Sequence, residues 1–153
     1  MALTICALIS IVLAALVAGL FCGPWLASTR SLATFEPPVF LAIVDRLNRN
    51  MAPLMTLLLP ASLLSMAAVL FLTFGDRPTT FSLTVAALAA FVVALLVTVL
   101  IEVPIVKQIA TWTVATLPSN WRQLRGRWGA FHIIRVLASM AGLALLVAGA
   151  LSM

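Results

Sequence analysis

Charged residues are scarce in this chain. They make up 8% of its 153 residues, whereas hydrophobic residues make up 64%. A soluble domain carries about 25% charged residues, and the mean hydropathy of +1.23 is far from that of a soluble protein. The composition therefore excludes a soluble globular domain and predicts an integral membrane protein.

Side chains that bind metals are also few. The chain has one histidine, His132, and two cysteines. Cys6 and Cys22 fall about 24 Å apart along one predicted helix, which is too far for a disulfide bond. A single histidine excludes bis-histidine haem ligation within one chain, and no Cys/His cluster suits zinc or an iron–sulfur centre. Because glycine-rich phosphate loops and nucleophile motifs are missing as well, we expect neither a metal nor a cofactor.

Four apolar runs fill most of the chain. They cover residues 3–27, 51–74, 80–103 and 131–151, and each is long enough to cross a hydrocarbon core of about 30 Å as a helix. The first run lacks a positive n-region and exceeds the length of a signal-peptide core, which favours a retained helix. The sequence predicts one all-α domain, residues 1–153, folded as a four-helix bundle in a bacterial plasma membrane.

Positive charge is distributed unevenly along the chain. The net charge is +5, but the second connection, residues 75–79, holds only Arg77, which Asp76 opposes. The first and third connections contain Arg30, Arg46, Arg49, Lys107, Arg122, Arg125 and Arg127. This asymmetry predicts that both of these connections are cytoplasmic and that both termini lie outside. The basic residues then face the lipid bilayer, and we expect no nucleic-acid partner.

The two cytoplasmic connections are amphipathic. In residues 36–50, Phe40, Val44 and Leu47 recur at helical spacing between charged residues. This predicts either a short interfacial helix or a cytoplasmic extension of the second membrane helix. The third connection has a similar pattern, and Pro104 is expected to kink the helix that precedes it.

Polar and small residues share one face of each predicted helix. In the last helix this face holds Trp128, His132, Arg135, Ser139, Gly142 and Gly149, and in the third it holds Thr84, Phe91, Thr98 and Glu102. In the second helix it holds Met51, Met55, Ser62, Val69 and Thr73, and in the first the GxxxG pair Gly19 and Gly23. Small and polar residues favour helix packing in lipid, so we expect all four faces to turn inward.

Ionisable residues inside membrane helices are costly and indicate a functional site by default. Glu102, His132 and Arg135 fall at one depth, near the cytoplasmic end. His132 could act as a general base oriented by Glu102, and Arg135 could stabilise an oxyanion. A purely structural Glu102–Arg135 pair is the alternative. Tryptophans could stack on a flat lipophilic aromatic molecule. The expected substrate-binding residues are Trp25, Arg30, Asn48, Trp112, Trp121, Arg127 and Trp128.

Several segments resemble the anthrone oxygenase-like family of small four-helix membrane proteins. They are "GLFCGPWLASTRSL", "FLAIVDRLNRNMAP", "VPIVKQIATW" and "PSNWRQLRGRWGAFHIIR". The positions that match the family motif are Pro104, Trp121, Arg127, Trp128, His132 and Arg135. One position departs from it, because Val106 stands where family members often carry asparagine. The resemblance implies oxidation of anthrones to anthraquinones by molecular oxygen without a cofactor.

The sequence thus favours a membrane-embedded oxygenase, or related oxidoreductase, that acts on a lipophilic aromatic molecule. The alternative from a different class is a non-catalytic membrane subunit or binding module for a quinone, a haem or a protein partner. A small transporter has less support, because the outer half of the bundle lacks charge. Association into a homo-oligomer stays open.

Overall fold

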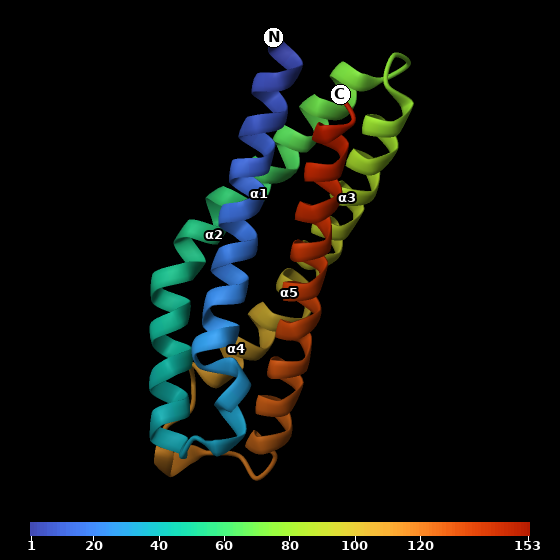
Figure 1. Ribbon diagram of the computed structural model, residues 1–153. Coiled ribbons are helices and arrows are strands. Elements are labelled where there is room, and N and C mark those ends of the chain that lie inside the picture. Colours follow the sequence, from blue (N-terminus) through green and yellow to red (C-terminus); the bar gives the residue numbers. More distant parts are fainter.

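Four long helices run side by side along the molecule (Figure 1). The computed structural model describes the backbone of residues 1–153 and every side chain except that of Thr29. The long helices are α1 (Ala2–Ala27), α2 (Pro37–Thr73), α3 (Pro78–Val97) and α5 (Trp121–Leu151). Together with the segments that continue them, they supply four spans long and apolar enough to cross a membrane. The predicted all-α, four-helix membrane bundle is confirmed.

Shorter elements connect these helices. A 3-10 helix, η1 (Thr29–Thr34), links α1 to α2. A π-helix, η2 (Thr98–Glu102), joins α3 directly to α4 (Val103–Ile109). A second 3-10 turn, η3 (Val114–Thr116), precedes α5.

Two helices extend beyond their predicted membrane spans. Helix α2 begins at Pro37 rather than at residue 51, so the amphipathic segment is an extension of this helix and not a separate interfacial one. Prolines in the first helical turn fit this start, because their missing N–H groups would have no partner there. Helix α5 likewise begins at Trp121, ten residues before the predicted span. Helix α2 contains Pro53 and Pro60, and Figure 1 shows that this helix is bent.

The two termini and the α2–α3 turn lie at one end of the bundle, and the two long connections lie at the other (Figure 1). We call the end with the two long connections the basic end. Its basic residues are Arg30, Arg46, Arg49, Lys107, Arg122, Arg125 and Arg127. That this end is cytoplasmic stays a prediction.

Cysteine labelling tests this orientation. In a background without Cys6 and Cys22, a cysteine replacing Asp45 or Arg122 should resist a membrane-impermeant maleimide added to intact cells, because positive loops stay inside. A cysteine replacing Asp76 should react and serves as the control. Labelling at residue 45 or 122 from the outside would reverse the proposed topology.

Helices α3 and α5 pack most closely through small residues. A Cβ atom added to Gly142 would lie 2.6 Å from the ring of Phe91 and 3.2 Å from the carbonyl oxygen of Ala87. The predicted inward face of α5 is confirmed, since Trp128, His132, Ser139, Gly142 and Gly149 are all buried.

The prediction for α1 is wrong. Gly19 and Gly23 are exposed, and a Cβ atom on either would meet nothing within 4 Å. The face that α1 buries holds Ala7, Ser10, Ala14, Val17, Ala18, Phe21 and Pro24. Alanine and serine on this second face are small enough for close approach, so GxxxG spacing alone does not reveal which side of the helix turns inward.

The contact at Gly142 gives a stability prediction. Gly142→Ala should lower the free energy of unfolding by about 1–3 kcal/mol, because Phe91 is fully buried and has no room to retreat. The matched control is Gly19→Ala on α1, where alanine meets open space and favours the helix. Thermal and denaturant unfolding in detergent would compare the two, and equal stabilities would refute the close packing.

Candidate functional site

Three ionisable side chains meet inside the bundle near its basic end. Arg135 Nη1 lies 2.5 Å from Glu102 Oε2, and Arg135 Nη2 lies 2.7 Å from His132 Nδ1. Arg135 also donates a longer bond of 3.4 Å to Thr98 Oγ1. The side chains of Glu102 and His132 are only 4% and 3% exposed. The expected contact of Glu102 with Arg135 is therefore confirmed, and we call Glu102, His132 and Arg135 the ionic cluster.

The π-helix η2 carries Glu102 into this cluster. In η2 the N–H of Val103 bonds to the carbonyl of Thr98, five residues back, so the turn holds one residue more than an α-turn. Pro104 has no N–H to give to the regular ladder, and the wide turn lies directly before it. A π-turn thus lies at the point where the sequence predicted a kink, and the helix continues after it as α4. Turns of this kind are frequent at functional sites.

The hydrogen bonds of His132 indicate the tautomer of its neutral ring. Guanidinium nitrogens only donate, so Nδ1 must accept the bond from Arg135. The proton of the neutral ring then sits on Nε2, which donates to the backbone carbonyl of Phe21 at 3.1 Å. Both ring nitrogens of His132 are therefore engaged. The pair of Glu102 and Arg135 carries no net charge.

Phe21 on α1 supports the cluster in two ways. Its carbonyl accepts the bond from His132, and its ring lies 4.1 Å from the guanidinium carbon of Arg135. A guanidinium stacked on an aromatic face is attracted to the ring electrons. Phe21 is itself only 2% exposed, so this helix fixes the orientation of two cluster residues.

Three polar atoms of the site have no hydrogen-bond partner among the described residues. They are Glu102 Oε1, Trp128 Nε1 and Arg135 Nε, and each has less than 1 Å² of accessible surface. Glu102 Oε1 lies 3.5 Å from His132 Nδ1, but neither atom carries a proton to share in this state. Buried polar atoms normally have partners, and leaving them unpaired is costly. The cluster and Trp128 thus hold one acceptor and two donors that no described residue satisfies.

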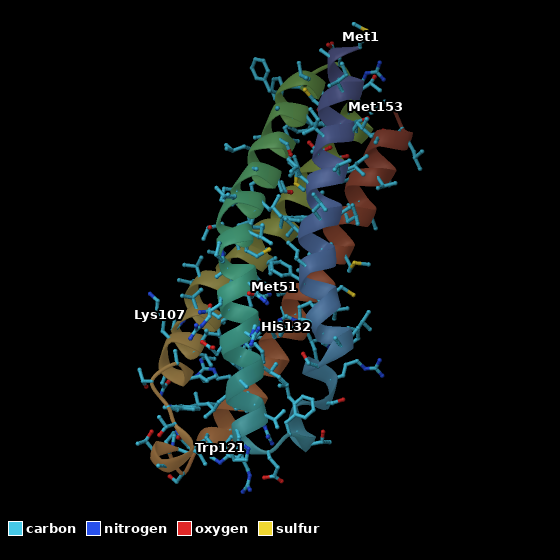
Figure 2. All side chains as sticks on the ribbon, turned by 90° about the vertical axis from the view of Figure 1, so that its left-hand side faces the viewer. Met1, Met51, Lys107, Trp121, His132 and Met153 are labelled. Atoms are coloured by element: carbon cyan, nitrogen blue, oxygen red, sulfur yellow. The ribbon has the colours of Figure 1, made fainter. Side chains whose placement is uncertain are left out.

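A cavity of about 400 Å³ lies beside the ionic cluster. Cavities of about 300–1,000 Å³ are typical of small-molecule sites. Its wall is mostly apolar and includes Phe21, Val44, Met51, Met55 and Val106, while Glu102, His132, Arg135 and Trp128 supply one side. Figure 2 shows Met51 of α2 and His132 of α5 at similar height, with Lys107 off to one side on α4. The cavity suits a flat, largely apolar molecule with a few oxygen atoms.

A model of a protein family described as anthrone oxygenase matches residues 40–145, more than half of the chain. The chain belongs to the anthrone oxygenase family. Neither the curated proteins nor the solved structures contain a match to it. The matched range includes the whole ionic cluster, whereas Phe21 and the other α1 residues of the cavity wall lie before it.

In this anthrone oxygenase family member, half of the expected site residues line the cavity. These are Glu102, His132, Arg135, Trp128 and Asn48. Trp112 lines a second cavity of about 240 Å³, which shares Val44, Asn48, Val106 and Ala110 with the first.

The other four expected binding residues lie away from both cavity walls. The ring of Trp121 packs 5.9 Å from the ring of Phe40. The guanidinium carbon of Arg125 lies 4.7 Å from the centre of the Trp121 ring. Trp25 and Arg30 stack on each other at 5.8 Å. Arg127 lies 5.8 Å from the ring of Phe131. These four residues thus contact other side chains of the protein near the basic end and do not line a cavity.

Phe21 and Lys107 are among the cavity residues to which the sequence assigns no role in the site. Phe21 acts through a backbone carbonyl, which gives no signal in a sequence. The charge pattern of the connections explains Lys107 as a topology signal, but its position five residues after Glu102 also places it near the same helix end.

Proposed function

We propose that this protein is a membrane-embedded, cofactor-independent oxygenase that converts an anthrone-like aromatic into the corresponding quinone. The observation that supports it is a buried carboxylate with one free oxygen, beside a guanidinium, on the wall of an apolar cavity. Membership of the anthrone oxygenase family supports the same chemistry.

The reaction needs a base and a stabilised oxyanion. An anthrone carries a CH₂ group opposite its ketone, and loss of one proton from that carbon puts negative charge on the ketone oxygen. Arg135 can stabilise this oxyanion, and more effectively where water is excluded. The electron-rich anthrolate then reduces oxygen and forms a carbon–oxygen bond as a hydroperoxide. Loss of water from the hydroperoxide gives the quinone, so anthrone and O₂ yield anthraquinone and H₂O with no other reductant.

We propose Glu102 as the proton acceptor in this scheme. The sequence favoured His132, but both nitrogens of its ring are engaged by Arg135 and by the carbonyl of Phe21. Glu102 Oε1 has no hydrogen-bond partner among the described residues, and the scheme requires substrate entry to uncover this atom. His132 then serves as a positioning residue that holds Arg135, and Arg135 stabilises the oxyanion.

Oxygen uptake tests this function. Purified protein in nanodiscs should accelerate uptake in the presence of an anthrone well above the rate of empty nanodiscs, which report spontaneous oxidation. With ¹⁸O₂, one labelled oxygen should appear in the quinone. Rates equal to those of empty nanodiscs across a panel of anthrones and lipophilic phenols would overturn the oxygenase. Saturable binding without uptake would instead support a quinone-binding module.

A further inference from the structure

The larger cavity opens sideways from the bundle. Its exposed lining residues belong to two neighbouring segments, α2 and the η2–α4 helix. On α2 they are Asn48, Ala52 and Thr56, and on α4 they are Val103, Lys107 and Ala110. The mouth therefore lies between α2 and α4, and not along the axis of the bundle.

The depth of this mouth follows from helix geometry. Thr56 and Asn48 lie about 26 Å and about 38 Å along α2 from its far end at Thr73, at 1.5 Å per residue. A hydrocarbon core is about 30 Å thick. With Thr73 placed at the outer boundary of this core, Thr56 borders acyl chains and Asn48 lies beyond the core, at the level of the lipid headgroups. Lys107 lines the same cavity as Asn48.

Lys107 is an unpaired cation at this edge. The other charged residues of the cavity wall, Glu102 and Arg135, neutralise each other at 2.5 Å. Asp45, on the wall of the second cavity, pairs with Arg49 at 2.9 Å. Among the described side chains no carboxylate lies within 4 Å of Lys107. The mouth therefore presents one net positive charge, with the amide of Asn48 also on its wall.

We propose that Lys107 selects aromatic substrates that carry a carboxylate or phenolate at one end. Such a molecule is an amphiphile, so it resides at the depth where the mouth opens. Its apolar rings enter between α2 and α4 toward the ionic cluster, while its anionic end stays at the headgroup level beside Lys107. The adjoining second cavity gives space for a ring substituent next to Asn48. This inference rests on the proposed function and specifies its substrate class.

Two probes of similar size separate charge recognition from shape. They are anthraquinone-2-carboxylate and 2-(hydroxymethyl)anthraquinone, and their binding to protein in nanodiscs of neutral lipid is measured against empty nanodiscs. Lys107→Gln should weaken binding of the carboxylate by about fivefold to tenfold, in line with the loss of a bond between charged groups. Binding of the neutral probe should change less than about twofold.

Arg46→Gln is the matched control. It removes one positive charge from the same end of the molecule, and Arg46 is exposed on α2 and lines neither cavity. It should leave both affinities unchanged. Lys107→Arg should retain the preference for the carboxylate.

Three results would overturn the inference. If Lys107→Gln weakened the binding of both probes equally, the side chain would contribute only shape. If Lys107→Gln and Arg46→Gln had equal effects on binding of the carboxylate, Lys107 would contribute only to the general positive charge of the surface. Either result leaves the proposed oxygenase intact. If the wild type bound neither probe, the proposed function and this inference would fail together.

Discussion

Glu102→Gln should slow substrate-dependent oxygen uptake by roughly 100-fold or more, the usual contribution of a positioned general base. The amide retains the size of the carboxylate but cannot take a proton from the substrate carbon. Glutamine still accepts a hydrogen bond from Arg135 through its carbonyl oxygen, but Arg135 loses its counter-charge and the fold loses stability. The rate is therefore compared on protein that remains folded. Size-exclusion chromatography in detergent would check this, and uptake by anthrone-loaded nanodiscs would give the rate.

His132→Gln provides the comparison that locates the base. Glutamine has a donor and an acceptor and can replace one of the two contacts that histidine makes. We expect uptake to fall less than about tenfold, because His132 positions Arg135 and does not touch the reacting carbon. A greater loss in His132→Gln than in Glu102→Gln would assign the base to His132, as the sequence suggested.

Arg135→Met should cost about 3–5 kcal/mol of unfolding free energy, because it leaves the carboxylate of Glu102 buried without its counter-charge. The stability would be measured by thermal and denaturant unfolding in detergent. The double variant Glu102→Gln/Arg135→Met removes both charges and should recover most of the loss. A single variant no less stable than the double one would show that the pair is not a coupled buried unit.

The sequence was sufficient for the features that depend on composition and periodicity. Four long apolar runs predicted the four helices, and the spacing of His132, Ser139 and Gly142 predicted the buried face of α5. Glu102, as the carboxylate of a membrane span, required a cation, and Arg135 on the facing helix supplied it. A charged side chain in a membrane span is costly unless it is paired, so few arrangements of Glu102 and Arg135 are possible.

The features that the sequence missed depend on three-dimensional packing. Gly19 and Gly23 have the spacing of a packing motif, but the neighbouring alanines of α1 offer an equally small face, and this second face is the one that packs. The bond from His132 to Phe21 uses a backbone carbonyl, a group common to all residues. The tryptophans of the basic end were expected at the ligand, yet Trp121 instead packs on Phe40 and Arg125. Aromatic side chains suit either environment, so residue type could not distinguish them.

The π-turn at Thr98–Glu102 shows how chain length can create a site. One surplus residue in an otherwise regular helix turns everything beyond it by about 100°. Glu102 and Lys107 both follow Thr98 in the chain. The number of residues in the π-turn therefore determines the direction in which their side chains point relative to α5. A single-codon insertion in an apolar helix can thus bring a polar group into a bundle that previously turned it toward lipid. An equally small deletion would dismantle the centre while leaving every one of its functional side chains in the gene.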